Sequence, residues 1–323
     1  MTAMQNIRHL LADDLEHLNS VIRQQLQTNN PLMDKVIEHY LQTKGKLIRP
    51  IMVMLTARMF GCVSDKVLSA AAAVELLHNA SLIHDDIVDQ ATTRRGMPTI
   101  NAVWDNHIAV LVGDFFVSSS MQQAISTGNV KIIDALCHLG KLLSLGELDQ
   151  IYNARYHTLT EESYYQIINY KTASLFVACA RMGCFAVGVD DERLEAMSRF
   201  AELLGMCFQI RDDIFDYFAE SEDLGKPTGN DLREGKITLP LLHVLLETSD
   251  EKMLELSQKE ILDEKEIEEL IQFAVNKGGV EYAYAKMREM QEQATTILNE
   301  KFADCNAKKA LLELFDYVIS REG

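Results

Sequence analysis

The sequence predicts an all-α protein, and three observations support this fold class. Apolar residues recur at spacings of three and four, as at Val67, Ala71 and Val74, which is the period of a helix. Alternating strand patterns are almost absent. The five prolines stand where segments begin or loops run, so they interrupt no long helical stretch. We therefore expect one large bundle of roughly ten or more helices around a central apolar cavity.

Composition and charge narrow the class of protein. The chain has 323 residues, of which 47% are hydrophobic and 24% charged, and this length can bury a sizeable apolar cavity. The formal net charge of -17 argues against a nucleic-acid surface, because phosphate backbones are bound by clustered cations. An anionic substrate would have to meet a local group of basic residues.

The cysteines and the apolar stretches indicate where in the cell the chain is expected to reside. Six cysteines without a C-x-x-C pair indicate a reducing environment, and the cytoplasm is the simplest expectation. Polar or charged residues interrupt every apolar stretch, so we expect no transmembrane segment and a soluble chain. Residues 1–11 lack the basic, apolar and small-residue parts of an export signal.

The chain is expected to form a single domain over residues 1–323. No linker rich in proline, glycine or serine divides it. The motifs described below fall within about 45–242, and 243–323 forms a helical C-terminal part. Its segment 249–269 is dense in Asp, Glu and Lys with apolar residues at helical spacing, which is typical of a solvated helical face.

One short motif occurs twice, as the hexapeptides HDDIVD at 84–89 and RDDIFD at 211–216. On an α-helix, positions i, i+1 and i+4 project to one side, so each copy presents three carboxylates together. The neighbouring residues are apolar, so these carboxylates interrupt a core-facing helix, and that placement is costly without cations. The candidate metal ligands are Asp85, Asp86, Asp89, Asp212, Asp213 and Asp216.

Carboxylate oxygens are ligands that Mg²⁺ prefers. The ion usually takes only one or two of them and leaves its other positions to water and substrate phosphate. Two such clusters, each with bound Mg²⁺, are therefore expected to bind one diphosphate between them. A single copy would be explained equally well by a solvated helix face, whereas two copies within apolar helices favour metal binding. A carboxylate-bridged di-iron site would need two Glu-x-x-His helices, and the sequence has one, from Glu75 to His78.

Basic residues follow both aspartate clusters, as a diphosphate site requires. Arg94 and Arg95 come shortly after the first copy, and Lys226 and Lys236 come after the second. The turn GKLIRP at 45–50 adds another basic pair, which by itself would be explained by a solvated surface turn.

With these motifs the sequence resembles the trans-polyprenyl diphosphate synthases, especially long-chain, octaprenyl diphosphate synthase-like members. The family's pattern of a G-K-x-x-R-P turn, two D-D-x-x-D helices, R-R-G, K-T and G-K loops appears between Gly45 and Leu242. The chain departs from this pattern at Lys44, where a second glycine is usual, and at Leu47, where an extra arginine is common. The resemblance implies the isoprenoid synthase fold and a homodimer.

The resemblance also implies a role for each matching residue. The isopentenyl diphosphate site would be formed by Lys46, Arg49, His78 and Arg95. The allylic diphosphate would be bound, through up to about three bridging Mg²⁺ ions, by Arg94, Lys171, Lys226 and Lys236. Direct metal ligands would be Asp85, Asp89 and Asp212, supported by Asp86, Asp213, Asp216 and Asp231.

The family transfers prenyl groups without a covalent protein nucleophile. Metal ions and cations neutralise the departing diphosphate, the double bond of isopentenyl diphosphate attacks the allylic cation, and a proton is lost. By this resemblance Lys171, Thr172 and Gln209 would stabilise the cation and the leaving group. The sequence accordingly offers no Ser/His/Asp or Cys/His arrangement, because the catalytic work is orientation and charge stabilisation.

The growing chain is expected to enter an apolar tunnel below the first aspartate cluster. Ala80 and Ser81 would form its upper wall, and both are small, whereas synthases that stop early carry a bulky aromatic there. Leu77 lies one turn further along, and the helix around Phe116 and Met121 would form the floor or plain core. The resemblance therefore implies a long product, about C30 or longer, for a quinone side chain, which would pass to the membrane.

Several alternatives remain open. A shorter-chain geranylgeranyl or farnesyl diphosphate synthase would carry the same motifs. A noncatalytic subunit of a heteromeric prenyl synthase would be expected to lose aspartates or cations that this chain keeps. A terpene cyclase or head-to-head synthase would lack the 45–50 turn with R-R-G. A pure metal-binding or scaffold protein would not need lysines beside its acidic clusters.

Overall fold

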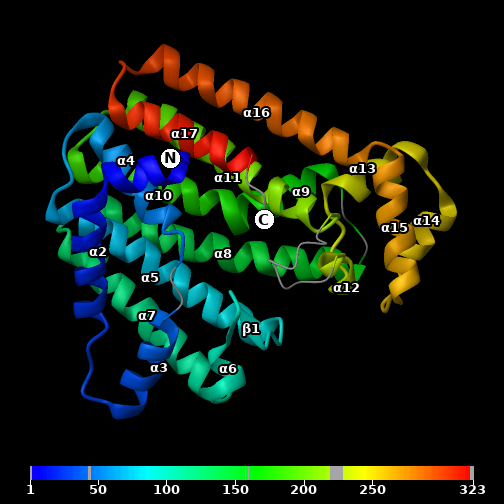
Figure 1. Cartoon of the computed structure of the whole chain (residues 1–323), viewed down its shortest axis with the longest axis horizontal. Coiled ribbons are helices and arrows are strands. Elements are labelled where there is room, and N and C mark those ends of the chain that lie inside the picture. Colours follow the sequence, from blue (N-terminus) through cyan, green and yellow to red (C-terminus); the bar gives the residue numbers. More distant parts are fainter. Residues whose placement is uncertain (1, 43–44, 157, 159, 219–227, 321–323) are drawn as a thin grey trace. The chain divides into compact units, whose positions relative to one another are not determined.

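The computed structural model describes residues 2–42, 45–156, 158, 160–218 and 228–320 (Figure 1). The described residues are mainly helical, with one short antiparallel hairpin, as the apolar periodicity predicts. The chain divides into two compact units. Unit 1 comprises 1–140, 175–198 and 303–313, and unit 2 comprises 141–174, 199–302 and 314–323. The expectation of a single domain stays a prediction.

Unit 1 carries the first aspartate cluster. It contains α1 (Ala3–Leu10), α2 (Ala12–Gln25), α3 (Pro31–Gln42), α4 (Ile48–Phe60), α5 (Asp65–Val88), β1 (Thr93–Arg94), β2 (Met97–Pro98), α6 (Ile100–Val103) and α7 (Asn106–Ser126). It also contains the first part of α8 (Val130–Tyr156), most of α10 (Ser174–Val187), and the first parts of α11 (Asp191–Phe215) and α17 (Asn306–Ser320).

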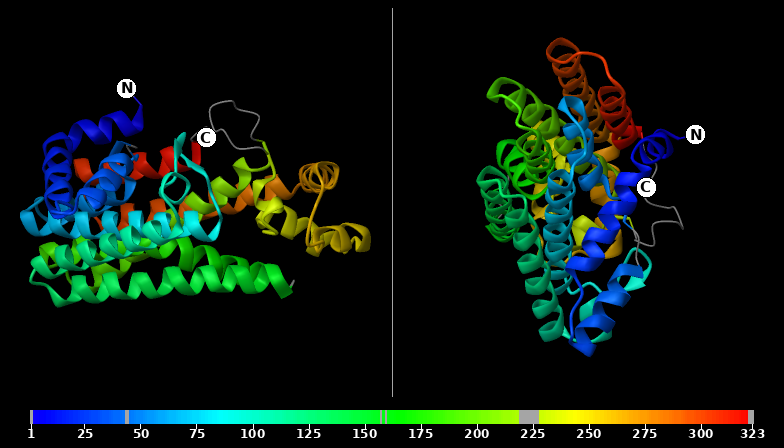
Figure 2. Two further views of the ribbon diagram at one scale, coloured as in Figure 1. Left: turned by 90° about the horizontal axis from the view of Figure 1, so that it is seen from below. Right: turned by 90° about the vertical axis from the view of Figure 1, so that its left-hand side faces the viewer.

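The core of unit 1 is built around α5, which is buried on nearly all sides from Val67 to Ala80. Four consecutive alanines, 70–73, keep this helix thin enough for its neighbours to approach closely. In each view α5 and α7 run side by side (Figure 1, Figure 2). Such all-round burial fixes the position of the aspartates at the end of α5.

Among the described residues, α5 and α7 are long and apolar enough to meet the length and hydropathy of a membrane span. The sequence predicts no transmembrane segment because polar or charged residues interrupt each apolar run. The mean hydropathy of α5 and α7 is nevertheless high, because a few charged residues lower an average only slightly. In α5, 72% of the apolar window is buried inside the protein, as in a core helix. In α7 the buried share is 39%, so much of this helix is exposed in the single chain.

Unit 2 carries the second aspartate cluster. It contains the remainder of α8, α9 (Glu161–Ile168), the π-helix η1 (Asn169–Ala173), the remainder of α11, α12 (Asn230–Arg233), α13 (Leu239–Thr248), α14 (Glu251–Ser257), α15 (Glu264–Asn276), α16 (Gly279–Lys301) and the end of α17.

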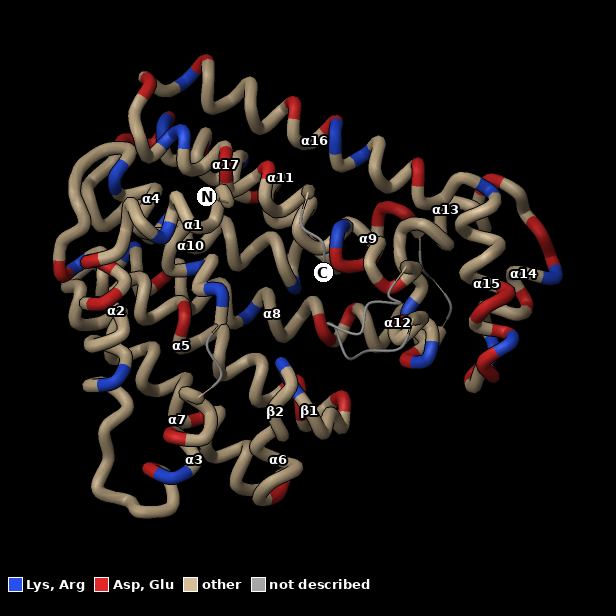
Figure 3. The backbone as a smooth tube through the Cα atoms, in the orientation of Figure 1, with Lys and Arg blue, Asp and Glu red and all other residues tan. Residues whose placement is uncertain are grey.

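In unit 2, α13 packs against both α15 and α16. The start of α16 comes very close to α13, because a Cβ at Gly279 would lie 2.1 Å from the Pro240 carbonyl oxygen. Acidic residues are concentrated in the first half of α15 (Figure 3). Several of them are exposed, and Glu269 pairs with Lys252 of α14. This is the solvated face that the 249–269 segment predicts.

Candidate functional site

The first aspartate cluster occupies the last turn of α5. Asp85 is partly exposed, Asp86 is only 4% exposed, and Asp89 is the exposed C-cap residue. The C-terminal end of a helix carries partial negative charge, so each carboxylate there costs roughly 0.3–1 kcal/mol, and the last turn of α5 holds no basic residue. This arrangement is unfavourable unless a cation is present.

Arg94 is held by the middle aspartate of this cluster. Its Nε donates to Asp86 Oδ1 at 2.8 Å, and its Nη2 lies 2.7 Å from the same oxygen. Arg94 stands on β1, in a hairpin whose two central residues, Arg95 and Gly96, both have positive φ (53° and 75°). Such a turn needs two left-handed residues, which explains the glycine of the R-R-G motif.

The G-K-x-x-R-P turn and the hairpin meet in unit 1. A Cβ at Gly45 would lie 2.8 Å from Arg95 Nη1, so the Arg95 guanidinium rests against the turn. Leu47, in left-handed conformation at φ 55°, precedes the first turn of α4, which carries Arg49. The Arg8 side chain donates to the Lys46 carbonyl at 3.0 Å. These contacts bring the predicted cations of the isopentenyl diphosphate site together.

His78 is buried beside these arginines, on α5. Burial and then Arg49, Arg95 and Arg94 lower the pKa of His78 well below its usual range, so the ring is neutral at pH 7. Glu75 lies one turn earlier, 7% exposed, and its Oε2 has no hydrogen-bond partner among the described residues. Burial raises the Glu75 pKa, while Arg49 and Arg95 lower it. The sequence flagged Glu75 only as an iron ligand and missed its place in this cationic cluster.

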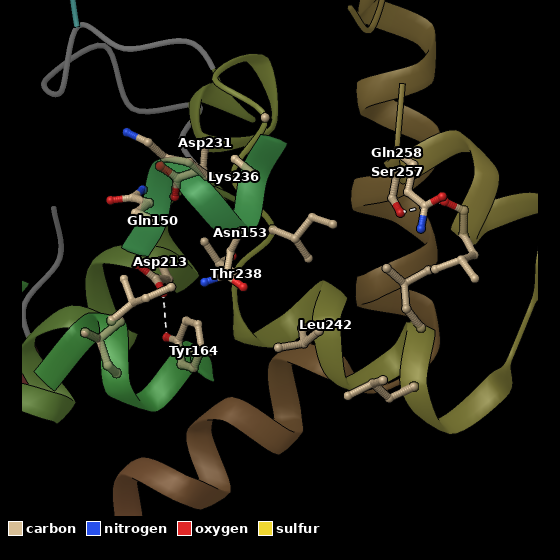
Figure 4. Close-up of a pocket in the computed structure, with 18 of the residues that line it drawn as sticks. Gln150, Asn153, Tyr164, Asp213, Asp231, Lys236, Thr238, Leu242, Ser257 and Gln258 are labelled. Atoms are coloured by element: carbon tan, nitrogen blue, oxygen red, sulfur yellow. Dashed lines mark hydrogen bonds between the residues drawn. The ribbon is translucent and has the colours of Figure 1, made fainter. Parts of the chain in front are cut away.

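The second cluster lies at the end of α11 and repeats the first in its burial. Asp212 is partly exposed and Asp213 is 3% exposed. Both Asp213 oxygens are occupied. Tyr164 Oη donates to Oδ2 at 2.6 Å (Figure 4), and Gln209 Nε2 donates to Oδ1 at 2.8 Å. In each copy, therefore, the first aspartate is accessible and the second is held by the protein.

Asp216 makes contacts that differ from those expected of a metal ligand. Its two oxygens accept the backbone N–H groups of Asn230 and Asp231 at 2.9 and 3.0 Å, at the start of α12. Asp216 thus fastens the segment that carries Asp231 to the end of α11. Lys236 then follows, with its backbone N–H bonded to the Asp231 carbonyl and its Nζ 2.5 Å from Glu234.

Carboxylates are crowded at this end of unit 2. Burial raises the pKa of Asp213 to about 6, with Asp212 and Asp216 contributing to the rise and the hydrogen bonds from Tyr164 and Gln209 opposing it. Burial and then Asp213 and Asp216 raise the pKa of Asp231 to about 8. The donors are all hard oxygens, which suit Mg²⁺ or a similar ion. Among the described residues no three His, Cys, Asp or Glu side chains form a metal-binding group, so such an ion would depend on additional ligands.

The K-T motif stands on the π-helix η1. Lys171 Nζ lies 2.6 Å from Glu147 and donates to Gln150 at 2.7 Å, both on α8. Thr172 Oγ1 donates to Gln209 Oε1 at 2.6 Å. π-bulges are rare in proteins as a whole. Those that do occur are often found at functional sites. The helical pattern alone does not reveal this bulge.

Gly146 on α8 makes room for the bulge, and we expect Gly146→Ala to damage it. A Cβ there would lie 2.9 Å from Lys171 N and 3.0 Å from Tyr170 Cβ, so the η1 backbone would have to shift. We expect a loss of about 1–3 kcal/mol in the free energy of unfolding, from urea titration, and a fall in kcat. Gly140→Ala on the same helix is the matched control, because nothing lies within 4 Å of its Cβ. Equal effects of both substitutions would contradict this role.

A pocket of about 530 Å³ opens at this cluster, within unit 2 (Figure 4). Its polar end presents Lys171, Gln209, Asp213, Asp231 and Lys236. Its apolar end is lined from α9, α13 and α14, and the acidic segment 249–269 contributes to this lining, which the sequence did not predict. The pocket therefore combines basic, acidic and apolar groups, as an amphiphilic anion with a metal ion would require.

The remaining predicted residues are placed as follows. Lys226 lies outside the described residues. Ala80 is fully buried and Leu77 is 9% exposed, both on α5. Ser81 is partly exposed, and its hydroxyl donates to the His78 carbonyl at 2.9 Å. Unit 1 thus gathers Arg49, His78, Arg94 and Arg95, and unit 2 gathers Lys171, Thr172, Gln209 and Lys236.

Comparison with known proteins identifies the family. Residues 30–274 match the family model described as polyprenyl synthetase. The chain is 32% identical to octaprenyl diphosphate synthase of Escherichia coli over 99% of both chains. A decaprenyl diphosphate synthase structure from Rhodobacter capsulatus matches with a TM-score of 0.92 at 31% identity, covering 99% of this chain and 100% of that one. A geranylgeranyl pyrophosphate synthase structure from Bacteroides thetaiotaomicron matches with a TM-score of 0.86 at 37% identity, covering 99% of both. The chain, with its all-α isoprenoid synthase fold, therefore belongs to the polyprenyl synthetase family.

Proposed function

We propose that the chain is a prenyltransferase that adds isopentenyl diphosphate head-to-tail to an allylic diphosphate. The observation that carries this proposal is the pairing of an aspartate cluster with cations in each unit. In unit 1, Asp86 pairs with Arg94 and lies beside Arg95, and in unit 2, Asp213 and Asp231 line one pocket with Lys171 and Lys236. Acidic clusters at helix C-termini favour the binding of a metal cation. The neighbouring basic residues favour a metal ion that carries a bound anion over a free metal ion.

Mg²⁺ is the proposed metal, held through the accessible aspartates Asp85, Asp89 and Asp212. When bound, it would neutralise the negative charge of the diphosphates. Asp86 and Asp213 would support the ligands from behind, because their own oxygens are held by Arg94, Tyr164 and Gln209.

The cations of unit 1 suit isopentenyl diphosphate. Arg49 and Arg95 would bind the diphosphate, and the neutral His78 ring would contribute a hydrogen bond without adding charge. In unit 2, Lys171, with Lys236, would bind the allylic diphosphate. The Thr172 oxygen and the Gln209 amide would lie near the developing allylic cation. Each of these groups orients substrate or stabilises charge, and none needs to form a covalent bond.

A long-chain product is the proposed outcome, as a precursor for a quinone side chain. Ala80 and Ser81 are small, so the α5 wall below the first cluster places no bulky side chain in the way of a growing chain. The similarity to octaprenyl and decaprenyl diphosphate synthases supports this proposal. A geranylgeranyl product is the second candidate, since one such synthase structure shares 37% identity with this chain.

The exposed face of α7 favours a homodimer. Leu111 is 64% exposed, Met121 47% and Ile125 61%, on one side of the helix. The sequence left Phe116 and Met121 as tunnel floor or plain core, and of these two Phe116 is buried whereas Met121 is exposed. On α8, Leu148 is likewise exposed, at 62%. An apolar stripe of this kind is typical of a surface covered by a second copy.

We expect the double substitution Leu111→Glu and Ile125→Glu to convert a dimer into monomers, because burying unpaired carboxylates costs several kcal/mol. Analytical ultracentrifugation measures the mass. Ile261→Glu is the control, since Ile261 is 84% exposed in a different segment. A monomeric unsubstituted chain, or a double variant that stays dimeric, would contradict the proposed interface.

The activity is tested directly with purified chain. It is incubated with Mg²⁺, labelled isopentenyl diphosphate and, in separate reactions, geranyl, farnesyl or geranylgeranyl diphosphate, and the products are sized by chromatography. Elongation beyond C20 supports a long-chain synthase, and a stop at C20 supports the geranylgeranyl alternative. Absence of elongation with every starter overturns the proposed function.

A further inference from the structure

Tyr164 is a buried hydroxyl that none of the sequence motifs includes. It stands on α9, is 3% exposed, and donates to Asp213 Oδ2 at 2.6 Å (Figure 4). The same carboxylate accepts from Gln209, and Gln209 in turn accepts from Thr172. Four side chains from α9, η1 and α11 thus form one continuous chain of hydrogen bonds.

The direction of these hydrogen bonds is fixed by the chemistry of the groups. An ionised carboxylate is an acceptor only, so Gln209 must turn its amide N–H toward Asp213 and its carbonyl oxygen toward Thr172. Thr172 has one hydroxyl proton, and the bond of 2.6 Å to Gln209 uses it. The Thr172 oxygen is left with lone pairs alone, which attract a positive charge and repel a negative one.

We infer that Tyr164 is a positioning residue for prenyl transfer: by holding Asp213 it orients the Gln209 amide, and so presents only lone pairs of the Thr172 oxygen to the allylic cation. This inference rests on the proposed function. It assigns Asp213 the task of orienting a neighbour, because both its oxygens are occupied by protein donors. It gives a use to the hydroxyl of Tyr164, which a phenylalanine of the same shape would lack.

The chain offers a matched pair of substitutions. Tyr164→Phe removes the hydroxyl and keeps the ring. Tyr165→Phe removes the neighbouring hydroxyl, which lies beside Glu161 and outside this chain of hydrogen bonds. Melting temperature checks folding of both variants. We expect Tyr164→Phe to lower kcat by roughly 10–100-fold, as loss of a supporting partner typically does, with the KM for isopentenyl diphosphate unchanged. Tyr165→Phe should leave both constants near those of the unsubstituted chain.

Two further measurements separate positioning from general damage. Calorimetry with Mg²⁺ compares an allylic thiodiphosphate with an ammonium analogue whose charged nitrogen replaces the allylic carbon. Tyr164→Phe should weaken binding of the cationic analogue by about tenfold or more and leave the thiodiphosphate unaffected. In a Thr172→Val background, Tyr164→Phe should have little additional effect on kcat, because both act through one oxygen.

The outcomes distinguish the two levels of proposal. An unsubstituted chain that elongates no starter overturns the proposed function. Elongation by the unsubstituted chain, with Tyr164→Phe and Tyr165→Phe equal in kcat and in analogue binding, overturns the role of Tyr164 alone. Additive effects of Tyr164→Phe and Thr172→Val also overturn it.

Discussion

Replacing Asp85 or Asp212 by asparagine is expected to lower kcat by roughly 10²–10³-fold or more without destabilising the protein. Asparagine keeps the shape of the side chain and removes the negative charge that would bind the metal ion of a metal-diphosphate complex. Both residues occupy the last turn of a helix, where a carboxylate is unfavourable. The melting temperature of the metal-free variants should therefore stay the same or rise. Steady-state kinetics and thermal unfolding in chelator measure the two effects.

The buried aspartate beside each of these residues provides the contrast. Asp86→Asn is expected to lower the free energy of unfolding by about 1–3 kcal/mol, because it weakens the hydrogen bonds from Arg94 that hold the hairpin. Asp134→Asn, at an exposed position of α8, should change neither property. If Asp85→Asn kept more than a tenth of the activity, Asp85 could not be the metal ligand proposed here.

The helical fold could be predicted because its cause is local. Apolar spacing and the positions of proline mark the helices, and the two hexapeptides stand at the C-terminal ends of α5 and α11. The glycine of R-R-G suits the tight turn found there, since Gly96 adopts a left-handed conformation. The order of cations along the chain placed Arg94 and Arg95 near the first cluster, and unit 1 brings them there.

The contacts that refine the site could not be predicted, because they join segments far apart in sequence. Tyr164 and Gly146 are ordinary helix residues until α9 meets α11 and η1 meets α8. Nothing within 211–216 indicates that Asp216 fastens α12 by two backbone hydrogen bonds. The exposure of Met121 could not be predicted either. An apolar residue at helical spacing fits a buried core and an exposed helix face equally well.

Ser81→Phe is expected to shorten the products, and it tests the part of the proposal that depends most on shape. Ser81 lies on α5, one turn before Asp85, and its hydroxyl is bonded to the His78 carbonyl. A phenylalanine at that position would place a ring below the first aspartate cluster, where the growing chain is proposed to extend. Early additions should proceed, and later ones should stop when the chain meets the ring. Chromatographic sizing of the products, with farnesyl diphosphate as starter, gives the distribution.

Ser81→Ala separates bulk from the lost hydrogen bond. It removes the hydroxyl without filling space, so it should keep the long products while its melting temperature reports any effect of the missing bond. Shortening by both substitutions would point to a shift of His78 instead of a blocked tunnel. An unchanged distribution in Ser81→Phe would remove the assignment of Ala80 and Ser81 as the tunnel wall. Product length would then have to be controlled by apolar residues elsewhere, since the proposed role of the first cluster concerns where elongation begins and not where the chain must end.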